Sequence, residues 1–224
     1  MSAAASDAGG KRRVFLVDDH PLVREGLTNL INQQKDLVVC GEAEDAPEAL
    51  QAIESQQPDA AVVDIALAGS SGIELIKDIR CVAPKVAMVV LSMHDEALYA
   101  ERALRAGARG YVMKRETTKK IVSALRDVLE GRLYVSDAFR TSMTEKLIDG
   151  KTGSSPVDQL SDRELEVFRQ LGKGHETRRI GESLSISMKT VQVYCARIKE
   201  KLNLATATEL RREAVRWWES QPQN

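Results

Sequence analysis

The stretch PDAAVVDIALAGSSG, residues 58–72, decides the fold of the first half of this 224-residue chain. Its apolar run AAVV has the length of a buried strand and is too short for an ordinary helix. The run ends at Asp64, and a loop rich in Gly and Ser follows. In open α/β sheets, ligands bind at the carboxyl ends of the parallel strands. Asp64 therefore lies where such a strand would present a functional carboxylate.

A second apolar run, VFLV at residues 14–17, ends in the same way at Asp18 and Asp19. If the two strands are neighbours, three carboxylates meet in one pocket. Carboxylate oxygens suit a hard divalent cation such as Mg²⁺, and a carboxylate can also accept a phosphoryl group. We predict a site for both, with Asp64 as the acceptor. Paired aspartates at one strand end are also compatible with a simple turn or helix cap.

Strand-like and helix-like stretches alternate from Lys11 to about Gly131. Apolar runs predict five strands, at residues 14–17, 37–42, 60–64, 85–92 and 110–114. Amphipathic stretches predict five helices, beginning at Pro21, after Asp45, after Gly72, at Ala97 and at Thr117. Five βα units predict an α/β domain with a flavodoxin-like, doubly wound parallel sheet in the order 2-1-3-4-5. That order brings the ends of the first and third strands together.

The second half of the chain has only helical patterns. Four helices are predicted, over residues 162–171, 176–184, 188–202 and 207–218. Capping residues precede three of them, namely Ser161 with Glu164, Ser187, and Thr206 with Glu209. Only residues 185–187 separate the second and third helices, and a short turn of this kind is typical of a helix-turn-helix.

These patterns predict the domain organisation. Residues 1–10 form a disordered N-terminus, 11–131 the α/β domain, 132–157 a linker, 158–219 an all-α helix-turn-helix domain, and 220–224 a tail. Within the linker, SDAFRTSMTEKLIDG has the pattern of a helix capped by Ser136, whereas KTGSSPVD is typical of a flexible connection.

Composition excludes several classes of protein. Hydrophobic residues make up 43% of the chain, charged residues 29%, and the net charge is −1, so any nucleic-acid partner must be met by a local basic patch. No signal peptide or membrane-length apolar run is present in the sequence. The three cysteines, Cys40, Cys81 and Cys195, are too far apart for a CxxC site and predict reduced thiols in the cytoplasm. His20, His94 and His175 are too dispersed to suggest a metal site.

Several strings, in this order and spacing, resemble a known family. They are VDDHPLVREGL (17–27), Asp64 with Gly72, LSMHDE (91–96), RAGARGYVMK (105–114), and the helical block from LSDRELEVFRQLGKG to TVQVYCARIKEKL. Residues 13–130 resemble a response-regulator receiver domain, and residues 158–218 resemble a LuxR-type DNA-binding domain. The chain is thus similar to two-component response regulators of the NarL/FixJ family.

The resemblance implies a role for each acidic residue. Asp64 would accept a phosphoryl group from a sensor histidine kinase. Asp18 and Asp19 would hold Mg²⁺, together with Asp64 and the backbone carbonyl of Ala66.

It also implies three residues around the phosphoryl group. Lys114 would neutralise one phosphoryl oxygen, Ser92 would donate its hydroxyl to another, and Tyr111 would follow the position of Ser92. Seen alone, Lys114 is equally compatible with a solvated strand-end charge, and Tyr111 with ordinary core packing.

In the second domain, residues 188–202 would be the recognition helix in the major groove of DNA. The residues implied in base or nearby phosphate contact are Lys189, Thr190, Gln192 and Tyr194, and those implied in phosphate contact are Arg197, Lys199 and Lys201. Val191, Ile198 and Leu202 are expected to pack the core. From Pro156 onward, 12 Lys/Arg stand against 10 Asp/Glu, so the positive charge is local.

The chain departs from the family pattern at several positions. The family has Pro at the position of Ala68, Pro or Asp at Arg115, Lys at Gln192 and His at Tyr194. None of these changes removes a residue that phosphorylation requires. The family uses the last helix for dimerisation; of its adjacent Trp217 and Trp218, we expect one to cover the domain and the other to serve a dimer contact or solvent.

We predict a cytoplasmic, phosphorylation-controlled DNA-binding transcription regulator that is not an enzyme. Its expected partners are a sensor histidine kinase, promoter DNA and a second copy when phosphorylated or DNA-bound, with RNA polymerase as a further candidate and no membrane. One alternative is a DNA-binding regulator whose receiver is a phosphorylation-independent dimerisation module. An aspartate-based phosphohydrolase is the enzyme alternative, but Ala66 occupies the position of its second catalytic acid.

Overall fold

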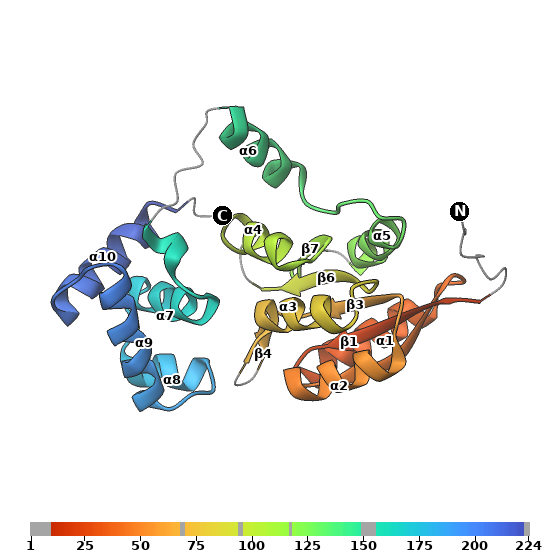
Figure 1. Ribbon diagram of the computed structural model, residues 1–224, viewed down its shortest axis with the longest axis horizontal. Helices are drawn as coiled ribbons and strands as arrows, with labels where there is room; N and C mark the ends of the chain where they lie inside the picture. The colour runs from red at the N-terminus through yellow and green to blue at the C-terminus, as the bar shows by residue number, and fades with distance from the viewer. Residues whose placement is uncertain (1–9, 68–69, 94–95, 117, 149–155, 222–224) are drawn as a thin grey trace. The chain divides into compact units, whose positions relative to one another are not determined.

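The computed structural model describes residues 10–67, 70–93, 96–116, 118–148 and 156–221 (Figure 1). The chain divides into two compact units, residues 1–144 and 145–224. Among the described residues, no helix is both long and apolar enough to cross a membrane. The predicted disordered N-terminus lies outside the described residues, apart from Gly10.

The first unit is built on a five-stranded parallel sheet in the order β2-β1-β3-β6-β7 (Figure 1). The strands are β1 (Arg12–Val17), β2 (Leu37–Ala43), β3 (Ala60–Val63), β6 (Ala87–Ser92) and β7 (Gly110–Met113). These are the five predicted strands, and the predicted order 2-1-3-4-5 is confirmed.

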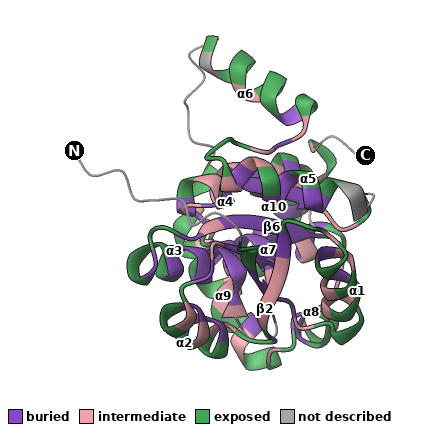
Figure 2. Cartoon of the chain, turned by 90° about the vertical axis from the view of Figure 1, so that its right-hand side faces the viewer, coloured by how far each residue is buried: buried purple, intermediate pink, exposed green. Residues whose placement is uncertain are grey.

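Helices on both faces of the sheet explain why its central strands are continuously apolar. These helices are α1 (Pro21–Asn32), α2 (Ala46–Gln56), α3 (Gly72–Val82), α4 (Glu96–Ala106) and α5 (Thr118–Leu129). All four residues of β3 are buried, as expected for a parallel strand covered on both faces. Figure 2 shows burial concentrated along the sheet, with exposed residues on the outer faces of the helices.

Local signals place the helix starts where the sequence predicts them. Pro21 is the first residue of α1, where its missing N–H costs no helical hydrogen bond. Asp45 precedes α2, and its side chain accepts a hydrogen bond from the backbone N–H of Glu48 at 2.9 Å.

The loop after β3 contains a feature that the sequence did not predict. Strands β4 (Ala66–Leu67) and β5 (Ser70–Ser71) pair as a small antiparallel sheet immediately before α3. The Gly/Ser-rich composition predicted only a loop, because two-residue strands leave no periodic pattern to read. Ala68 lies outside the described residues.

The beginning of the predicted linker is docked onto the first unit. The backbone N–H of Tyr134 donates to the Arg109 carbonyl, and the Tyr134 carbonyl accepts from the N–H of Tyr111, both at 2.9 Å. Tyr134 therefore pairs with the open edge of the sheet beside β7 through one isolated bridge. We call residues 132–136 the docked segment.

The docked segment is also fixed to a helix. The backbone N–H of Ser136 donates to Glu96 Oε1 of α4 at 2.9 Å, and Val135 is buried. Helix α6 (Asp137–Ile148) follows, with the Ser136 hydroxyl accepting the N–H of Phe139 at 3.1 Å, as the capping pattern predicts. Most of the flexible stretch predicted after α6 lies outside the described residues.

The second unit is a small helical domain. It contains a 3₁₀ helix at Pro156–Gln159, then α7 (Asp162–Gly172), α8 (Thr177–Ser183), α9 (Met188–Lys201) and α10 (Ala207–Glu219). The capping box of Ser161 with Glu164 is present, and Ser187 and Thr206 cap α9 and α10 through their side chains. One half of the predicted capping box at Thr206 is present, because the Thr206 hydroxyl accepts from the N–H of Glu209 at 3.1 Å. The Glu209 carboxylate accepts from the N–H of Ala205, one residue before the N-cap, at 2.8 Å.

The turn between α8 and α9 lies directly on Gly181. A Cβ atom at this position would be only 2.8 Å from the backbone carbonyl oxygen of Ile186. The close crossing of α8 by the turn therefore requires a residue without a side chain, and this crossing sets the angle of the helix-turn-helix.

We predict that Gly181→Ala destabilises the second unit by about 1–3 kcal/mol, the usual cost of overpacking. Trp217 and Trp218 are the only tryptophans of the chain, so their fluorescence during denaturant unfolding reports on this unit alone. The matched control is Gly26→Ala in α1, where an added Cβ meets nothing within 4 Å. It should leave the tryptophan transition unchanged and stabilise the first unit by about 0.5–1 kcal/mol. An unchanged tryptophan transition in Gly181→Ala would contradict the steric account.

Candidate functional site

The sheet brings the predicted acidic residues together. Val17 of β1 pairs with Val63 of β3, and the backbone N–H of Asp64 donates to the Val17 carbonyl at 2.9 Å. Ligand atoms of Asp18, Asp19, His20 and Asp64 all lie within 4.8 Å of one another. The side chains of Asp18 and Asp64 are almost completely buried.

Lys114 joins two of these carboxylates. Its Nζ lies 2.6 Å from Asp18 Oδ2 and 2.6 Å from Asp64 Oδ2, and only 10% of its side chain is exposed. Its backbone N–H donates to the carbonyl of Ser92 at 2.8 Å, which ties the end of β7 to the end of β6. Residues from four strand ends thus meet in one pocket.

The pocket shifts the pKa values of Asp64 and Lys114. Burial raises the pKa of Asp64, because a charged carboxylate loses hydration there, and Lys114 only partly offsets this. Burial acts to lower the pKa of Lys114, but the carboxylates of Asp64 and Asp18 outweigh it and raise that pKa. The lysine is therefore a permanent cation at neutral pH, and it keeps the two aspartates in place as partners.

Asp19 carries an observation that favours a cation. Its Oδ1 is buried and lies 2.7 Å from His20 Nδ1, and its carboxylate belongs to the cluster of ligand atoms within 4.8 Å of one another. Carboxylate oxygens gathered in this way are the ligands that a hard divalent cation prefers. The oxygen atoms of Asp18, Asp19 and Asp64 thus form a donor set that fits Mg²⁺.

Ala66 and His20 both lie beside the acidic cluster, but only Ala66 was predicted from the sequence. Ala66, predicted to offer its carbonyl, donates its N–H to Asp64 Oδ1 at 3.2 Å. His20 was set aside because the histidines are dispersed, yet it lies against Asp18 and Asp19. Its position directly after the two aspartates was the available signal.

Gly72 packs against the backbone of Asp64. Its N–H donates to the Ile65 carbonyl at 2.9 Å, and a Cβ atom at this position would lie 1.9 Å from the backbone oxygen of Asp64. The start of α3 therefore packs directly against the backbone of Asp64, at a distance that only glycine permits.

The side chains of Ser92 and Tyr111 contact one another. Both side chains are buried, at the end of β6 and within β7. Burial raises the pKa of Tyr111 well above its ordinary value, opposed by a hydrogen bond with the side chain of Ser92. The tyrosine ring is thus turned into the unit and bonded to the hydroxyl beside the acidic pocket.

In the second unit, α9 presents one exposed ridge. Val191 and Ile198 are fully buried and fix which side faces inward. The exposed residues between Lys189 and Glu200 share the opposite side, at helical spacing, and are Lys189, Gln192, Val193, Ala196, Arg197 and Glu200.

Val193 was missed by sequence reasoning. It is 44% exposed, in the middle of a ridge with Gln192 and Arg197 beside it. An apolar side chain in the major groove can contact the methyl group of thymine, whereas Gln can bond adenine. The sequence gives no signal for this residue, because an apolar side chain in a helix is expected to be buried, and only its exposure shows otherwise.

The other residues implied in DNA contact are not equally available. Lys201 Nζ is 2.6 Å from the buried Glu164 carboxylate and donates to the Gln159 carbonyl at 3.2 Å. Lys201 therefore stabilises the unit itself.

The remaining residues of the set differ in their exposure. Thr190 and Ser187 share a hydroxyl hydrogen bond of 2.8 Å, and Tyr194 and Lys199 are half-buried. Lys189 and Arg197 are exposed.

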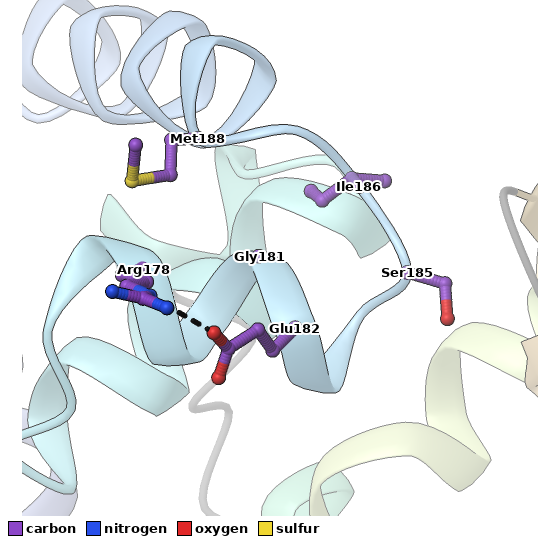
Figure 3. Close-up of a pocket in the computed structure, with 6 residues that line it drawn as sticks. All are labelled: Arg178, Gly181, Glu182, Ser185, Ile186 and Met188. Atoms are coloured by element: carbon purple, nitrogen blue, oxygen red, sulfur yellow. Dashed lines mark hydrogen bonds and ion pairs between the residues drawn. The ribbon is translucent and has the colours of Figure 1, made fainter.

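A shallow hollow of about 420 Å³ lies beside the first turn of α9 (Figure 3). It is lined by Arg178, Gly181, Glu182, Ser185, Ile186 and Met188. Arg178 and Glu182 already form an ion pair of 3.1 Å across its rim, as the dashed line in Figure 3 marks. The remaining lining is apolar or hydroxyl-bearing, so the hollow adds no catalytic group to this surface.

Both tryptophans of α10 pack within their own unit. The Trp217 ring lies 5.5 Å from Phe168 of α7, and Lys173 Nζ lies 4.9 Å from the Trp218 ring. Each tryptophan is half-buried. Trp217 thus covers the domain through Phe168, while Trp218 contacts Lys173 and keeps part of its surface exposed. A dimer contact by one of them stays a prediction.

Comparison with known proteins identifies two family models in the chain. The response regulator receiver domain matches residues 14–126, and the luxR family of bacterial regulatory proteins matches residues 158–214. The chain is 33% identical over 204 residues to the oxygen regulatory protein NreC of Staphylococcus carnosus, covering 88% of this chain and 94% of that protein. It is 32% identical over 203 residues to the response regulator UvrY of Escherichia coli K12, with 91% and 93% covered.

Solved structures agree with this result. A LuxR-family two-component response regulator from Aurantimonas sp. SI85-9A1 has 35% identity and a TM-score of 0.58, covering 62% of this chain and 99% of that one. RcsB from Salmonella enterica serovar Typhimurium, bound to promoter rprA, shares the fold, with 24% identity, a TM-score of 0.58 and 92% and 99% coverage.

We predict that Gly72→Ala displaces the backbone of Asp64 and destabilises the first unit by about 1–3 kcal/mol. Backbone amide shifts of Asp64 and Ile65 in NMR spectra would report the displacement, and thermal unfolding the loss of stability. Gly26→Ala, which adds the same methyl group to open space, is the control. Unchanged shifts at both residues would contradict the packing described for α3.

Proposed function

We propose that Asp64 is the phosphoacceptor of this chain. The chain belongs to the two-component response regulators with a LuxR-type DNA-binding domain. A protein of this family is a phosphorylation-controlled DNA-binding transcription regulator. The observation that carries the assignment is the contact of Lys114 with both Asp18 and Asp64 at 2.6 Å. This contact supports the assignment, because a fixed cation beside Asp64 would stabilise charge on a transferred phosphoryl group.

The acidic pocket supports a Mg²⁺ site made by Asp18, Asp19 and Asp64, with the Ala66 carbonyl as a further ligand. The ligand atoms of these three aspartates lie within 4.8 Å of one another, which favours this assignment. When bound, the cation neutralises the charge of phosphoryl oxygens that would otherwise repel the attacking carboxylate.

The transfer step uses Asp64 as a nucleophile. A carboxylate oxygen of Asp64 bonds to the phosphorus of a phosphohistidine on a sensor histidine kinase as the P–N bond breaks, and the histidine nitrogen keeps the electron pair. Lys114 Nζ then bonds an oxygen of the transferred group, and the hydroxyl of Ser92 bonds another. The product is an acyl phosphate on Asp64.

Ser92 is the residue through which phosphorylation of Asp64 would change the structure outside the pocket. Movement of Ser92 is followed by Tyr111, with which its side chain is hydrogen-bonded. The backbone N–H of Tyr111 bonds the docked segment, and Glu96, four residues after Ser92, bonds Ser136. A shift of α4 relative to β7 thus alters the anchorage of the segment that leads to α6.

The output is DNA binding by α9 in the cytoplasm. The contacts predicted from the sequence are Lys189, Thr190, Gln192, Tyr194, Arg197, Lys199 and Lys201, to which the ridge adds Val193. Of these, Lys201 is held by Glu164, so we propose that Lys189 and Arg197 supply the main cationic contacts. A phosphorylated or DNA-bound homodimer would place two such helices in half-sites about one helical turn apart. RNA polymerase is a further candidate partner at promoter DNA.

Two alternatives make different predictions. A receiver that serves only for constitutive dimerisation would leave DNA binding independent of phosphodonor. A phosphohydrolase would turn over small phosphoesters, but Ala66 stands in place of the second acid, so we restrict phosphatase activity to the protein's own phosphoaspartate and propose no enzyme function.

We predict that acetyl phosphate with Mg²⁺ increases both the oligomer mass and the DNA affinity of the wild-type chain, and that Asp64→Asn abolishes both responses. The amide keeps the size of the side chain but cannot form the acyl phosphate. Mass is measured by light scattering and affinity by fluorescence anisotropy on promoter DNA. An equal response in Asp64→Asn would contradict the assignment.

We predict that Glu96→Ala loosens the docked segment without phosphorylation, because Ser136 N–H loses its acceptor. Hydrogen exchange at Ser136 and Tyr111 should accelerate, while exchange in β1 stays unchanged. Glu96→Gln keeps an acceptor oxygen and should resemble the wild type, and Ser136→Ala removes only the cap hydroxyl. Identical exchange in Glu96→Ala and the wild type would contradict the proposed coupling.

A further inference from the structure

Arg24 on α1 connects the acidic loop with the end of β2. Its Nη1 donates to the backbone carbonyl of Asp18 at 2.6 Å. Its Nε lies 3.8 Å from Glu42 Oε2, and its Nη2 lies 3.7 Å from Glu44 Oε2. Only 14% of the side chain is exposed, so the guanidinium lies within the unit and not in solvent.

This contact completes the fixation of Asp18. The Asp18 N–H donates to the Ala43 carbonyl at 3.2 Å. Its Oδ1 accepts the N–H of His20 at 2.9 Å, and its Oδ2 lies 2.6 Å from Lys114 Nζ. With Arg24 on the carbonyl, every polar group of Asp18 has a partner, and the orientation of the residue is determined from four directions.

We propose that Arg24 is a positioning residue for the divalent cation, an inference that rests on the proposed function. The carbonyl that it bonds belongs to the peptide joining Asp18 to Asp19. Fixing this peptide fixes the direction in which the Asp19 side chain leaves the backbone. Arg24 thereby sets the distance between the carboxylates of Asp18 and Asp19 before a cation arrives.

The chemistry of the side chain suits this role. The bond goes to the backbone carbonyl of Asp18, so Arg24 takes up neither carboxylate oxygen of that residue. The planar fork of a guanidinium directs several donors at once, here to Asp18 and toward Glu42 and Glu44. A lysine has a single nitrogen and cannot replace these three contacts from one position.

A purely structural role would give a different result. An arginine that only fastens α1 to β2 would contribute to stability but not to cation affinity. Measuring both the Mg²⁺ affinity and the free energy of unfolding of the same variants distinguishes the two roles. Arg126 provides the control, since its Nε and Nη2 bond Asp36 at 2.8 Å each on the surface of the same unit.

The experiment is titration of the full chain with Mg²⁺, followed by calorimetry, for the wild type, Arg24→Met, Arg24→Lys and Arg126→Met. We expect affinity to fall by about 10–100-fold in Arg24→Met, the usual effect of removing a group that orients metal ligands. Arg24→Lys should also bind more weakly than the wild type, and Arg126→Met should bind equally well. With acetyl phosphate, the loss in phosphorylation rate of the Arg24 variants should disappear at saturating Mg²⁺.

Wild-type Mg²⁺ affinity in folded Arg24→Met would overturn the inference while leaving the proposed cation site intact. Should that variant not fold, wild-type affinity in Arg24→Lys would overturn it equally. A phosphorylation defect that persists at saturating Mg²⁺ would also count against a role in cation positioning. Failure of the wild-type chain itself to bind Mg²⁺ would instead overturn the proposed site, and this inference with it.

Discussion

The ion pairs of Lys114 with Asp18 and Asp64 are the constraint on which the rest of the first unit depends. Buried carboxylates repel one another and lose hydration, and they persist only when a cation offsets both costs. Lys114 supplies that cation from the end of β7, at 2.6 Å from each carboxylate. The sheet order is what makes this possible, because it places the ends of β1, β3 and β7 around one pocket. The same pocket is where we propose that Mg²⁺ and the phosphoryl group bind.

Close packing links this pocket to its surroundings on two sides. Gly72 allows α3 to begin against the backbone of Asp64, so the acceptor cannot move without disturbing a helix. Tyr111 connects the pocket to the docked segment, because its side chain bonds Ser92 while its N–H bonds Tyr134. The backbone of Asp64 is packed against α3, whereas the connection from Tyr111 to the docked segment consists of two backbone hydrogen bonds.

Much of the fold and of the pocket could be predicted because each part has a local signal. Apolar runs ending in Asp or Lys mark strand ends, and strand order then brings Asp18, Asp64 and Lys114 together. The contact of Arg24 with the Asp18 carbonyl could not be predicted in this way, because it joins a helix to a loop and leaves no pattern in the sequence. The docked segment escaped prediction for a similar reason: one residue, Tyr134, pairs with the sheet, and no periodic pattern announces it. Val193 was overlooked because an apolar residue in a helix is expected to be buried, and only the packing of Val191 and Ile198 shows that it is not.

The central claim is that Asp64 alone carries the phosphoryl group. Borohydride reduction of the chain after incubation with acetyl phosphate and Mg²⁺, followed by peptide mass spectrometry, tests it most directly, because reduction converts a phosphorylated aspartate into homoserine. The account predicts homoserine at position 64 and unmodified aspartate at positions 18 and 19. Homoserine at position 18 or 19, or at none of the three, would contradict it.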